Sequence, residues 1–501
     1  MQGVEGRSVG RLSFLVQSPE GLHRTCTFGR LYGCQVAIPV QPSLSLFKQP
    51  HERGNHGTCE RFAEKTPMID VSPHVEKDSV DSEIPVRIAL PYLLVVGQQL
   101  PLFRDESGQL FADELWQKDL SMHLDYLDHL MIASPCLEQT PPPHAKPLSI
   151  GKSTVELIEL PQQKSFLHFL AIMPSIAFRL CKAVSRAGIV HSAIVGWPIP
   201  MGWLVTPLTL IFRKPLVIVV ESATWRLQDG TRAGWKRRFR ALVQEFMGQW
   251  VLRKAALVIC TQDEYRRSLL GSEQAHGFVI PASWIDRKDI LPEEAAEEHW
   301  RKKLSVSDSR LRILFVGRLA HDKGIHILLE AMRQLDIDSF PMSLGIVGDG
   351  VLKGQCESIA SELTRTTKVS LLGTVRYGEP LFAVIRSYDA VVVPSIGDEQ
   401  PRIVFDAYSQ AVPVLGSDTP GLRSCVKSGD RYLLAPPNDV PALVALLRYA
   451  AENRLELKRL GLECLAYAES MTHQEMHRQR ANLLQHMLDE RTQSRLVSNP
   501  S

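Results

Sequence analysis

Several features that would identify a function at once are scarce in this sequence. Its 57 Lys and Arg residues nearly balance its 55 Asp and Glu residues, and so small a net charge does not indicate a nucleic-acid-binding protein. The nine cysteines contain no Cys-x-x-Cys pair, which favours reduced thiols in the cytoplasm over a disulfide framework or a zinc site. We therefore expect a cytoplasmic protein with no bound metal and no nucleic-acid partner.

Targeting and membrane-spanning segments are scarce as well. The N-terminus lacks the basic segment, compact apolar stretch and small-residue cleavage site of a secretory leader. The one membrane candidate is the uncharged run 192–212, which three prolines interrupt although it reaches the roughly 20 residues that span a bilayer. We favour a buried strand, a loop containing Gly196, Trp197 and Gly202, and then a core-facing helix.

The length and the apolar pattern predict two domains of the α/β class. The 501 residues exceed the roughly 100 to 200 residues of a typical domain. After residues 1–84, expected to be a disordered extension, short apolar runs alternate with helical patterns in two series. This alternation predicts two Rossmann-like, doubly wound parallel sheets. We assign 85–295 to the first domain, 296–310 to a linker, 311–470 to the second domain, 471–492 to a C-terminal helix and 493–501 to a tail.

The expected strands follow from these runs. In the first domain they are 86–90, 130–133, 189–191, 216–220 and 256–259, and in the second they are 312–316, 343–347, 369–372 and 390–393.

Two turns of the second domain carry residues suited to an anion. Ligands of parallel sheets bind beyond the carboxyl ends of the strands. Gly317 follows such a strand and lets backbone approach a ligand, while Arg318 and Lys323 supply a forked donor and a mobile charge. Gly348 begins a similar turn after the next strand. Together these residues suit a diphosphate, although solvated surface charges and an ordinary turn would give the same pattern.

An acidic loop followed by a short helical pattern is the more informative segment. Asp398 and Glu399 follow the strand 390–393 and could accept hydrogen bonds from sugar hydroxyls, whereas Asp406 could hold a ribose diol. The helix N-terminus near Arg402 and Ile403 would favour phosphate. The alternative is that the first two carboxylates only cap this helix and that Asp406 is solvated.

The segments between residues 311 and 450 resemble the donor domain of the retaining GT-B glycosyltransferases, in particular glycosyltransferase family 4. The resemblance implies a GT-B fold, in which two Rossmann-like domains face each other across a cleft; the first binds the acceptor and the second the nucleotide sugar. It implies that Arg318 and Lys323 hold the diphosphate. Two acidic residues eight apart contact the donor sugar and the ribose in this family, and that spacing falls on Asp398 and Asp406.

The sequence also departs from the family. Both acidic positions are normally glutamates, so Glu399 is an alternative to Asp398 as the first carboxylate. Ala411 stands where the family usually has a glycine. In the first domain, the glycine-rich loop expected after the first strand is reduced to Gly97 in the stretch 91–97.

The resemblance singles out two residues of the first domain. His191, at a strand end, is at a common family position, although a lone histidine there is often structural. Glu221 follows the strand 216–220, where many relatives have a histidine that faces the reacting sugar. It could orient the acceptor or stabilise positive charge, or it could cap a helix entered at Trp225.

A basic amphipathic stretch lies at residues 232–240. Lys236, Arg237, Arg238 and Arg240 lie there beside Trp235 and Phe239. Such a helix can adsorb to anionic lipid at the inner face of the membrane or steer a phosphorylated acceptor. A solvated helix face is the alternative.

The resulting hypothesis is a hexosyltransferase-type glycosyltransferase of polysaccharide biosynthesis. It transfers a sugar from a nucleotide-diphosphate sugar to a hydroxyl of a glycan, a lipid-linked acceptor or a small molecule, without a metal or other cofactor. Retention at the anomeric carbon is implied by the resemblance. A non-catalytic partner subunit of the same fold and a sugar-nucleotide 2-epimerase remain as alternatives, whereas a dinucleotide oxidoreductase would need a G-x-G-x-x-G after a first strand.

Overall fold

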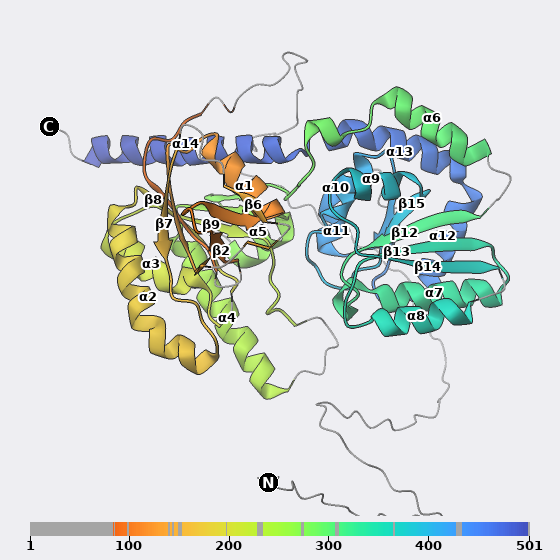
Figure 1. Ribbon diagram of the computed structural model, residues 1–501, viewed down its shortest axis with the longest axis horizontal. Helices are drawn as coiled ribbons and strands as arrows, with labels where there is room; N and C mark the ends of the chain where they lie inside the picture. Colours follow the sequence, from red (N-terminus) through yellow and green to blue (C-terminus); the bar gives the residue numbers. More distant parts are fainter. Residues whose placement is uncertain are drawn as a thin grey trace, which may run out of the picture. The chain divides into compact units, whose positions relative to one another are not determined.

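A computed structural model of the chain confirms two parallel α/β domains (Figure 1). It describes residues 84, 86–97, 100–138, 141–142, 145–148, 153–196, 198–227, 234–271, 275–305, 310–363, 366–426 and 433–498. The expected N-terminal extension, 1–84, lies outside these residues except for Ile84.

The first domain is built on a parallel sheet with the order β11-β10-β9-β8-β1-β4-β7. Its strands are β1 (Tyr92–Val95), β4 (His129–Ser134), β7 (Thr154–Glu159), β8 (Ile189–Ala193), β9 (Leu216–Val220), β10 (Leu257–Cys260) and β11 (Gly277–Val279). Its helices are α1 (Glu114–Leu124), α2 (Phe166–Arg186), α3 (Met201–Ile211), α4 (Trp235–Lys254) and α5 (Asp263–Leu270).

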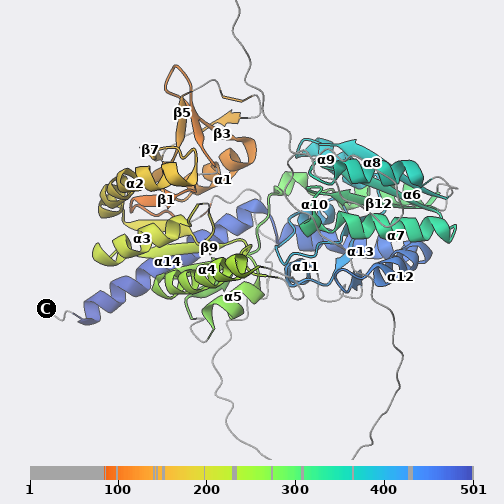
Figure 2. The same cartoon turned by 90° about the horizontal axis from the view of Figure 1, so that it is seen from below.

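Both faces of this sheet are buried, as a run of uninterrupted apolar residues requires. In β9, Leu216, Ile218 and Val220 pack into the core beneath α2, α3, α4 and α5. Val217 and Val219 point the other way, into the core that α1 and the C-terminal helix cover. Helices α2, α3 and α4 lie side by side in both views (Figures 1 and 2).

The start of the first domain differs from the prediction. The first strand of the sheet is β1 (Tyr92–Val95), not 86–90; Ile88 makes only an isolated bridge to Leu127. A small sheet of order β5-β2-β3-β6, which the sequence pattern did not indicate, follows β1. Its strands are β2 (Leu102–Arg104), β3 (Leu110–Asp113), β5 (Cys136–Glu138) and β6 (Ala145–Pro147).

The second domain is a parallel sheet with the order β14-β13-β12-β15-β16-β17. Its strands are β12 (Leu311–Val316), β13 (Met342–Val347), β14 (Thr367–Gly373), β15 (Ala390–Val393), β16 (Val414–Ser417) and β17 (Leu434–Ala435). Its helices are α6 (Glu293–Ser305), α7 (Ile325–Ile337), α8 (Lys353–Glu362), α9 (Glu379–Arg386), α10 (Ile403–Tyr408), α11 (Pro420–Cys425), α12 (Val440–Glu452) and α13 (Arg454–Glu469), with short 3-10 helices η1 (Arg287–Asp289) and η2 (His321–Lys323).

The expected linker 296–310 is largely helix α6, which belongs to the core of the second domain. Trp300 of α6 is buried in that core and donates through its indole N–H to the carbonyl of Ala411 at 2.8 Å. The burial of Trp300 is why a segment that reads as charged still packs against the sheet.

Helix α14 (His473–Ser498) returns to the first domain. Its apolar residues Met476, Ala481, Leu484 and Met487 join the core under α1. The helix also includes residues 493–498 of the expected tail.

The candidate membrane run 192–212 divides into the end of β8, a loop, and the eleven-residue helix α3. Gly202 lies in α3 and not in the loop as expected; a Cβ there would lie 2.6 Å from the carbonyl oxygen of Ala193. Among the described residues, α2 is the helix whose length and apolar composition would allow a membrane crossing.

Candidate functional site

The turns after β12 and β13 approach each other closely. The Gly317 N–H donates to the carbonyl of Val347 at 3.0 Å. Gly348 has a φ of 138°, and a Cβ there would lie 1.9 Å from the carbonyl oxygen of Gly317. Only glycine fits such a position, so the two turns expected to face the donor are locked together through backbone.

The basic turn after β12 meets the acidic loop after β15. Lys323 Nζ lies 2.9 Å from a carboxylate oxygen of Glu399 and 3.6 Å from one of Asp322. Arg318 lies 3.2 Å from the same Asp322 oxygen. The structure thus joins three of the predicted site residues at the carboxyl edge of the second sheet.

Backbone contacts hold the turn after β12 against the loop after β15. Gly324 has the left-handed φ of 68°, and a Cβ there would lie 1.8 Å from the carbonyl oxygen of Pro394. The N–H groups of Ile396 and Gly397 both donate to the carbonyl of Asp322.

Asp398 is held through its backbone by the first domain. Its carbonyl accepts hydrogen bonds from Gln262 at 2.6 Å and from the Tyr265 hydroxyl at 3.2 Å. The neighbouring side chain of Gln400 exchanges two hydrogen bonds with the backbone of Ala282. The carboxylate that reaches Lys323 is that of Glu399, the alternative first carboxylate.

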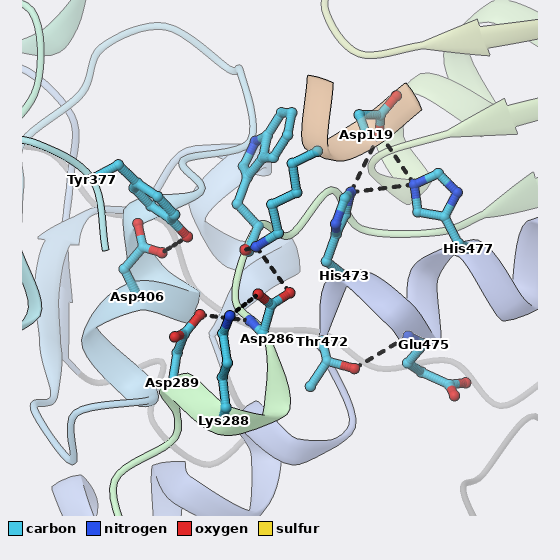
Figure 3. A network of polar contacts seen from close by, with 12 residues as sticks. Asp119, Asp286, Lys288, Asp289, Tyr377, Asp406, Thr472, His473, Glu475 and His477 are labelled. Atoms are coloured by element: carbon cyan, nitrogen blue, oxygen red, sulfur yellow. Dashed lines mark hydrogen bonds and ion pairs between the residues drawn. The ribbon is translucent and has the colours of Figure 1, made fainter. Parts of the chain in front are cut away.

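Asp406 lies inside α10 and is not solvated. Its carboxylate accepts a hydrogen bond of 3.0 Å from the Tyr377 hydroxyl (Figure 3). Burial raises the pKa of Asp406 to about 7, and Tyr377, Arg402 and Lys118 oppose part of that rise. The carboxylate is thus a buried hydrogen-bonding group that titrates near neutral pH.

Helix α10 is short. It spans six residues from Ile403, with Arg402 at its N-cap and Pro401 ahead of the cap. So short a helix has a weak dipole. The Arg402 guanidinium lies 5.2 Å from the centre of the Trp284 ring.

The two predicted site residues of the first domain lie at a pocket of about 490 Å³. His191 and Glu221 lie in it, together with Arg402 from the second domain. Nδ1 of His191 is 2.9 Å from the Tyr92 hydroxyl, and burial lowers the pKa of His191 to about 3, so its ring is neutral. His191 lies within β8 and does not end it.

Glu221 is an exposed carboxylate directly after β9. The described residues 221–227 contain no helix, and the next described helix, α4, begins at Trp235, so the alternative that Glu221 caps a helix entered at Trp225 is wrong. Trp225 instead donates to Glu245 of α4 at 2.7 Å.

A buried polar cluster beside this pocket was missed by the sequence analysis. Asp119 of α1 meets His473 and His477 of α14 (Figure 3), and His123 of α1 lies beside Asp119. Each pair is spaced four residues apart on a helix, a pattern that was available in the sequence. What the sequence could not show is that two helices more than 350 residues apart face each other.

The comparisons with known proteins agree with this architecture. Residues 296–463 match the family model described as glycosyl transferases group 1. The chain is 24% identical to alpha-D-kanosaminyltransferase of Streptomyces kanamyceticus over 47% of this chain and 61% of that protein. It is 33% identical to an uncharacterised glycosyltransferase of Methanocaldococcus jannaschii over 26% of this chain and 33% of the relative. The chain thus spans less than two-thirds of both relatives.

The solved structures show the same fold. Sucrose-phosphate synthase from Thermosynechococcus elongatus superposes with a TM-score of 0.58 at 18% identity, covering 80% of this chain and 99% of that one. Anabaena HepE in complex with UDP and glucose gives a TM-score of 0.54 at 15% identity, covering 79% and 99%. The protein therefore has the GT-B fold, and its residues 296–463 are similar to the glycosyl transferases group 1 family.

Proposed function

We propose that this protein is a glycosyltransferase that moves a hexose from a nucleotide-diphosphate sugar to an acceptor hydroxyl, with retention and without a metal. The observation that carries the proposal is the meeting of Lys323 and Glu399 at 2.9 Å. A cation and a carboxylate from two loops converge where parallel sheets bind ligands.

The donor binds the second domain through three interactions. Arg318 and Lys323 bind the diphosphate, and they stabilise the charge that develops as it leaves. Glu399 accepts hydrogen bonds from the sugar, and Asp406 accepts them from the ribose. Anabaena HepE, which has also been crystallised with UDP-glucose, supports this donor class.

The acceptor occupies the pocket of the first domain. The neutral imidazole of His191 and the carboxylate of Glu221 line it, and both can hydrogen-bond to hydroxyl groups. Arg402 lies at the same pocket and gives it a positive charge that suits a phosphorylated acceptor.

The exposed surface of the first domain supports an acceptor at a membrane. Large exposed apolar residues gather on the adjacent helices α2, α3 and α4: Phe166, Leu167, Leu170, Phe178, Leu210, Ile211, Trp235, Phe239, Leu242 and Phe246. On α4, the exposed basic residues Lys236, Arg237, Arg238 and Arg240 lie among them. Aromatic and basic side chains together adsorb to anionic lipid. We propose a cytoplasmic protein that adsorbs to the inner face of the membrane and uses a lipid-linked polysaccharide precursor.

A donor panel tests the transferase. Purified protein is incubated with nucleotide sugars, with and without chelator, and sugar transfer and donor hydrolysis are measured. We expect turnover that survives chelation and is lost in Lys323→Ala, whereas Lys368→Ala, which removes an exposed lysine of β14, retains it.

The alternatives give different results. Binding of a nucleotide diphosphate without turnover of any donor would favour a non-catalytic partner subunit. Interconversion of the nucleotide sugar itself would favour a 2-epimerase.

Vesicle sedimentation tests the membrane surface. We expect binding to vesicles containing phosphatidylglycerol but not to phosphatidylcholine alone. Replacing Trp235 and Phe239 by serine should weaken this binding, while Tyr449→Ser, at an exposed aromatic of the second domain, should not. Equal binding of the native protein to both vesicles would rule out an anionic lipid surface.

A further inference from the structure

Two helices from opposite ends of the described chain bring four ligand-type side chains together. Helix α1 contributes Asp119 and His123, and helix α14 contributes His473 and His477. Residues four apart lie on the same face of a helix, so each helix presents its pair to the other. The three histidines are almost completely buried.

The spacing of their atoms is that of ligands around one ion. One carboxylate oxygen of Asp119 lies 3.3 Å from Nε2 of His473 and 3.1 Å from Nε2 of His477, and these two nitrogens are 3.2 Å apart (Figure 3). Tetrahedral zinc with bonds of about 2.0 to 2.1 Å separates its ligand atoms by about 3.3 Å. All three sides of this triangle are close to that length.

His123 lies beside Asp119 and His477. Its Nδ1 is 2.8 Å from the backbone carbonyl of Asp119, to which it donates, and this leaves the lone pair of Nε2 free. Ligand atoms of Asp119, His123 and His477 lie within 4.8 Å of one another. A backbone acceptor on the far nitrogen is the usual way in which a protein orients a ligating imidazole.

Surrounding side chains orient the other two rings. The Tyr126 hydroxyl lies 3.4 Å from Nδ1 of His477. The Trp284 ring stacks on His473 with centroids 5.2 Å apart. Such contacts hold ligands in place and are typical of metal sites.

We propose that Asp119, His473 and His477 bind one divalent transition metal ion of the zinc class, with His123 beside them as a candidate fourth ligand. Three imidazoles and one carboxylate are ligands that zinc prefers. Asp119 and His123 line the pocket, which gives the ion a path from solvent. Arg480 approaches Asp119 at 4.0 Å, and this second cation lowers the affinity of the site.

The ion would cross-link α14 to α1 beside the acceptor pocket. It uses none of the residues assigned to the diphosphate, so a metal-free transfer reaction is compatible with it. The proposal replaces the expectation that no metal is bound, which considered only the spacing of cysteines.

Metal binding by the full chain tests the site. After treatment with chelator and its removal, the protein is titrated with Co²⁺ alone and the absorption of four-coordinate cobalt is followed. Thermal unfolding is measured with Zn²⁺ and with Mg²⁺. We expect one equivalent of cobalt and a higher Tm with Zn²⁺ but not with Mg²⁺. Absence of the cobalt bands in the native protein would overturn the proposal.

Variants locate the site. His477→Gln and Asp119→Asn should weaken cobalt binding about 100-fold or more, whereas His486→Gln, at an exposed histidine of the same helix, should not. Unchanged binding in folded His477→Gln and Asp119→Asn would overturn the assignment. The readout is metal binding, so its outcome is independent of whether sugar transfer is observed.

Discussion

Lys323 and Glu399 form an ion pair of 2.9 Å between the loops that follow β12 and β15. Both side chains are partly exposed, so the pair contributes little to stability by itself. We infer that a bound diphosphate replaces Glu399 as the partner of Lys323. The carboxylate is then released to contact the sugar.

This exchange predicts which acidic residue, Asp398 or Glu399, contacts the donor sugar. Glu399→Gln should lower kcat/KM about 10² to 10³-fold, as the loss of one positioned polar group does in other enzymes. Asp398→Asn should have a much smaller effect, because the carboxylate that contacts Lys323 is that of Glu399. Steady-state kinetics with the active donor measure both, and a larger loss in Asp398→Asn would reverse the assignment.

Glycine at position 324 is predicted to be essential to the basic turn. Gly324→Ala would place a Cβ on the Pro394 carbonyl at a φ of 68°, and we expect a loss of more than about 2 kcal/mol in the free energy of unfolding. The matched change Gly354→Ala in α8 meets no neighbour within 4 Å and should stabilise by about 0.5 to 1 kcal/mol. Urea unfolding compares them; equal stabilities would show that the turn relaxes freely.

The buried carboxyl of Asp406 predicts a pH dependence of stability. Its pKa is raised from 3.8 to about 7, so between these values the folded protein keeps a proton that the unfolded chain has lost. Stability therefore falls as the pH rises from about 4 to about 7, by on the order of 4 kcal/mol from this group. Asp406→Asn should remove this part of the slope in urea unfolding measured across that range.

The groups that face Asp406 set the size of the effect. The Tyr377 hydroxyl, Arg402 and Lys118 favour the ionised form, and Asp289 disfavours it. Tyr377→Phe removes a hydrogen bond to the carboxylate and should raise the pKa of Asp406 further. If the free energy of unfolding depended on pH in the same way in the native protein and in Asp406→Asn, this carboxyl would not titrate as described.

Asp389 is predicted to be a major determinant of stability in the second domain. It is fully buried, and its carboxylate accepts from the backbone N–H of Arg312 at 2.9 Å and from that side chain at 3.0 Å. Asp389→Ala removes the carboxylate that accepts from the Arg312 backbone and side chain, and should lower the free energy of unfolding by about 3 to 5 kcal/mol. Asp338→Ala, which removes an exposed ion pair with Arg448, should cost less than about 1 kcal/mol; similar losses would contradict the difference in burial.

The sequence predicted the sheets well where apolar runs are uniform. Strands β9 and β15 have the predicted bounds because continuous branched aliphatic residues favour a strand buried on both faces. The first strand was misplaced because Pro91 separates two apolar runs that fit the pattern equally. Pairing of the second run with β4 and β8 selects Tyr92–Val95, and pairing is a property of the folded sheet.

The meeting of site residues was predicted where they follow neighbouring strands of one sheet. Arg318, Lys323 and Glu399 meet as the strand-end rule requires, whereas the Asp119 and His473 pairing depends on where α14 packs. Ala411, noted only as a departure from a usual glycine, has a left-handed φ of 55°. The sequence showed the substitution but not the backbone conformation that favours glycine there.

Helix α14 has a consequence for the order in which the chain is completed during synthesis. The residues that finish the core of the first domain, Met476 to Met487, leave the ribosome only after the whole sheet of the second domain. The second domain can bury its own sheet before then, although N-terminal domains generally fold first. The half of the protein that is translated earlier is thus the half that is finished later, and a nascent chain that has emerged only to the end of α13 would carry a closed second domain and an open first one.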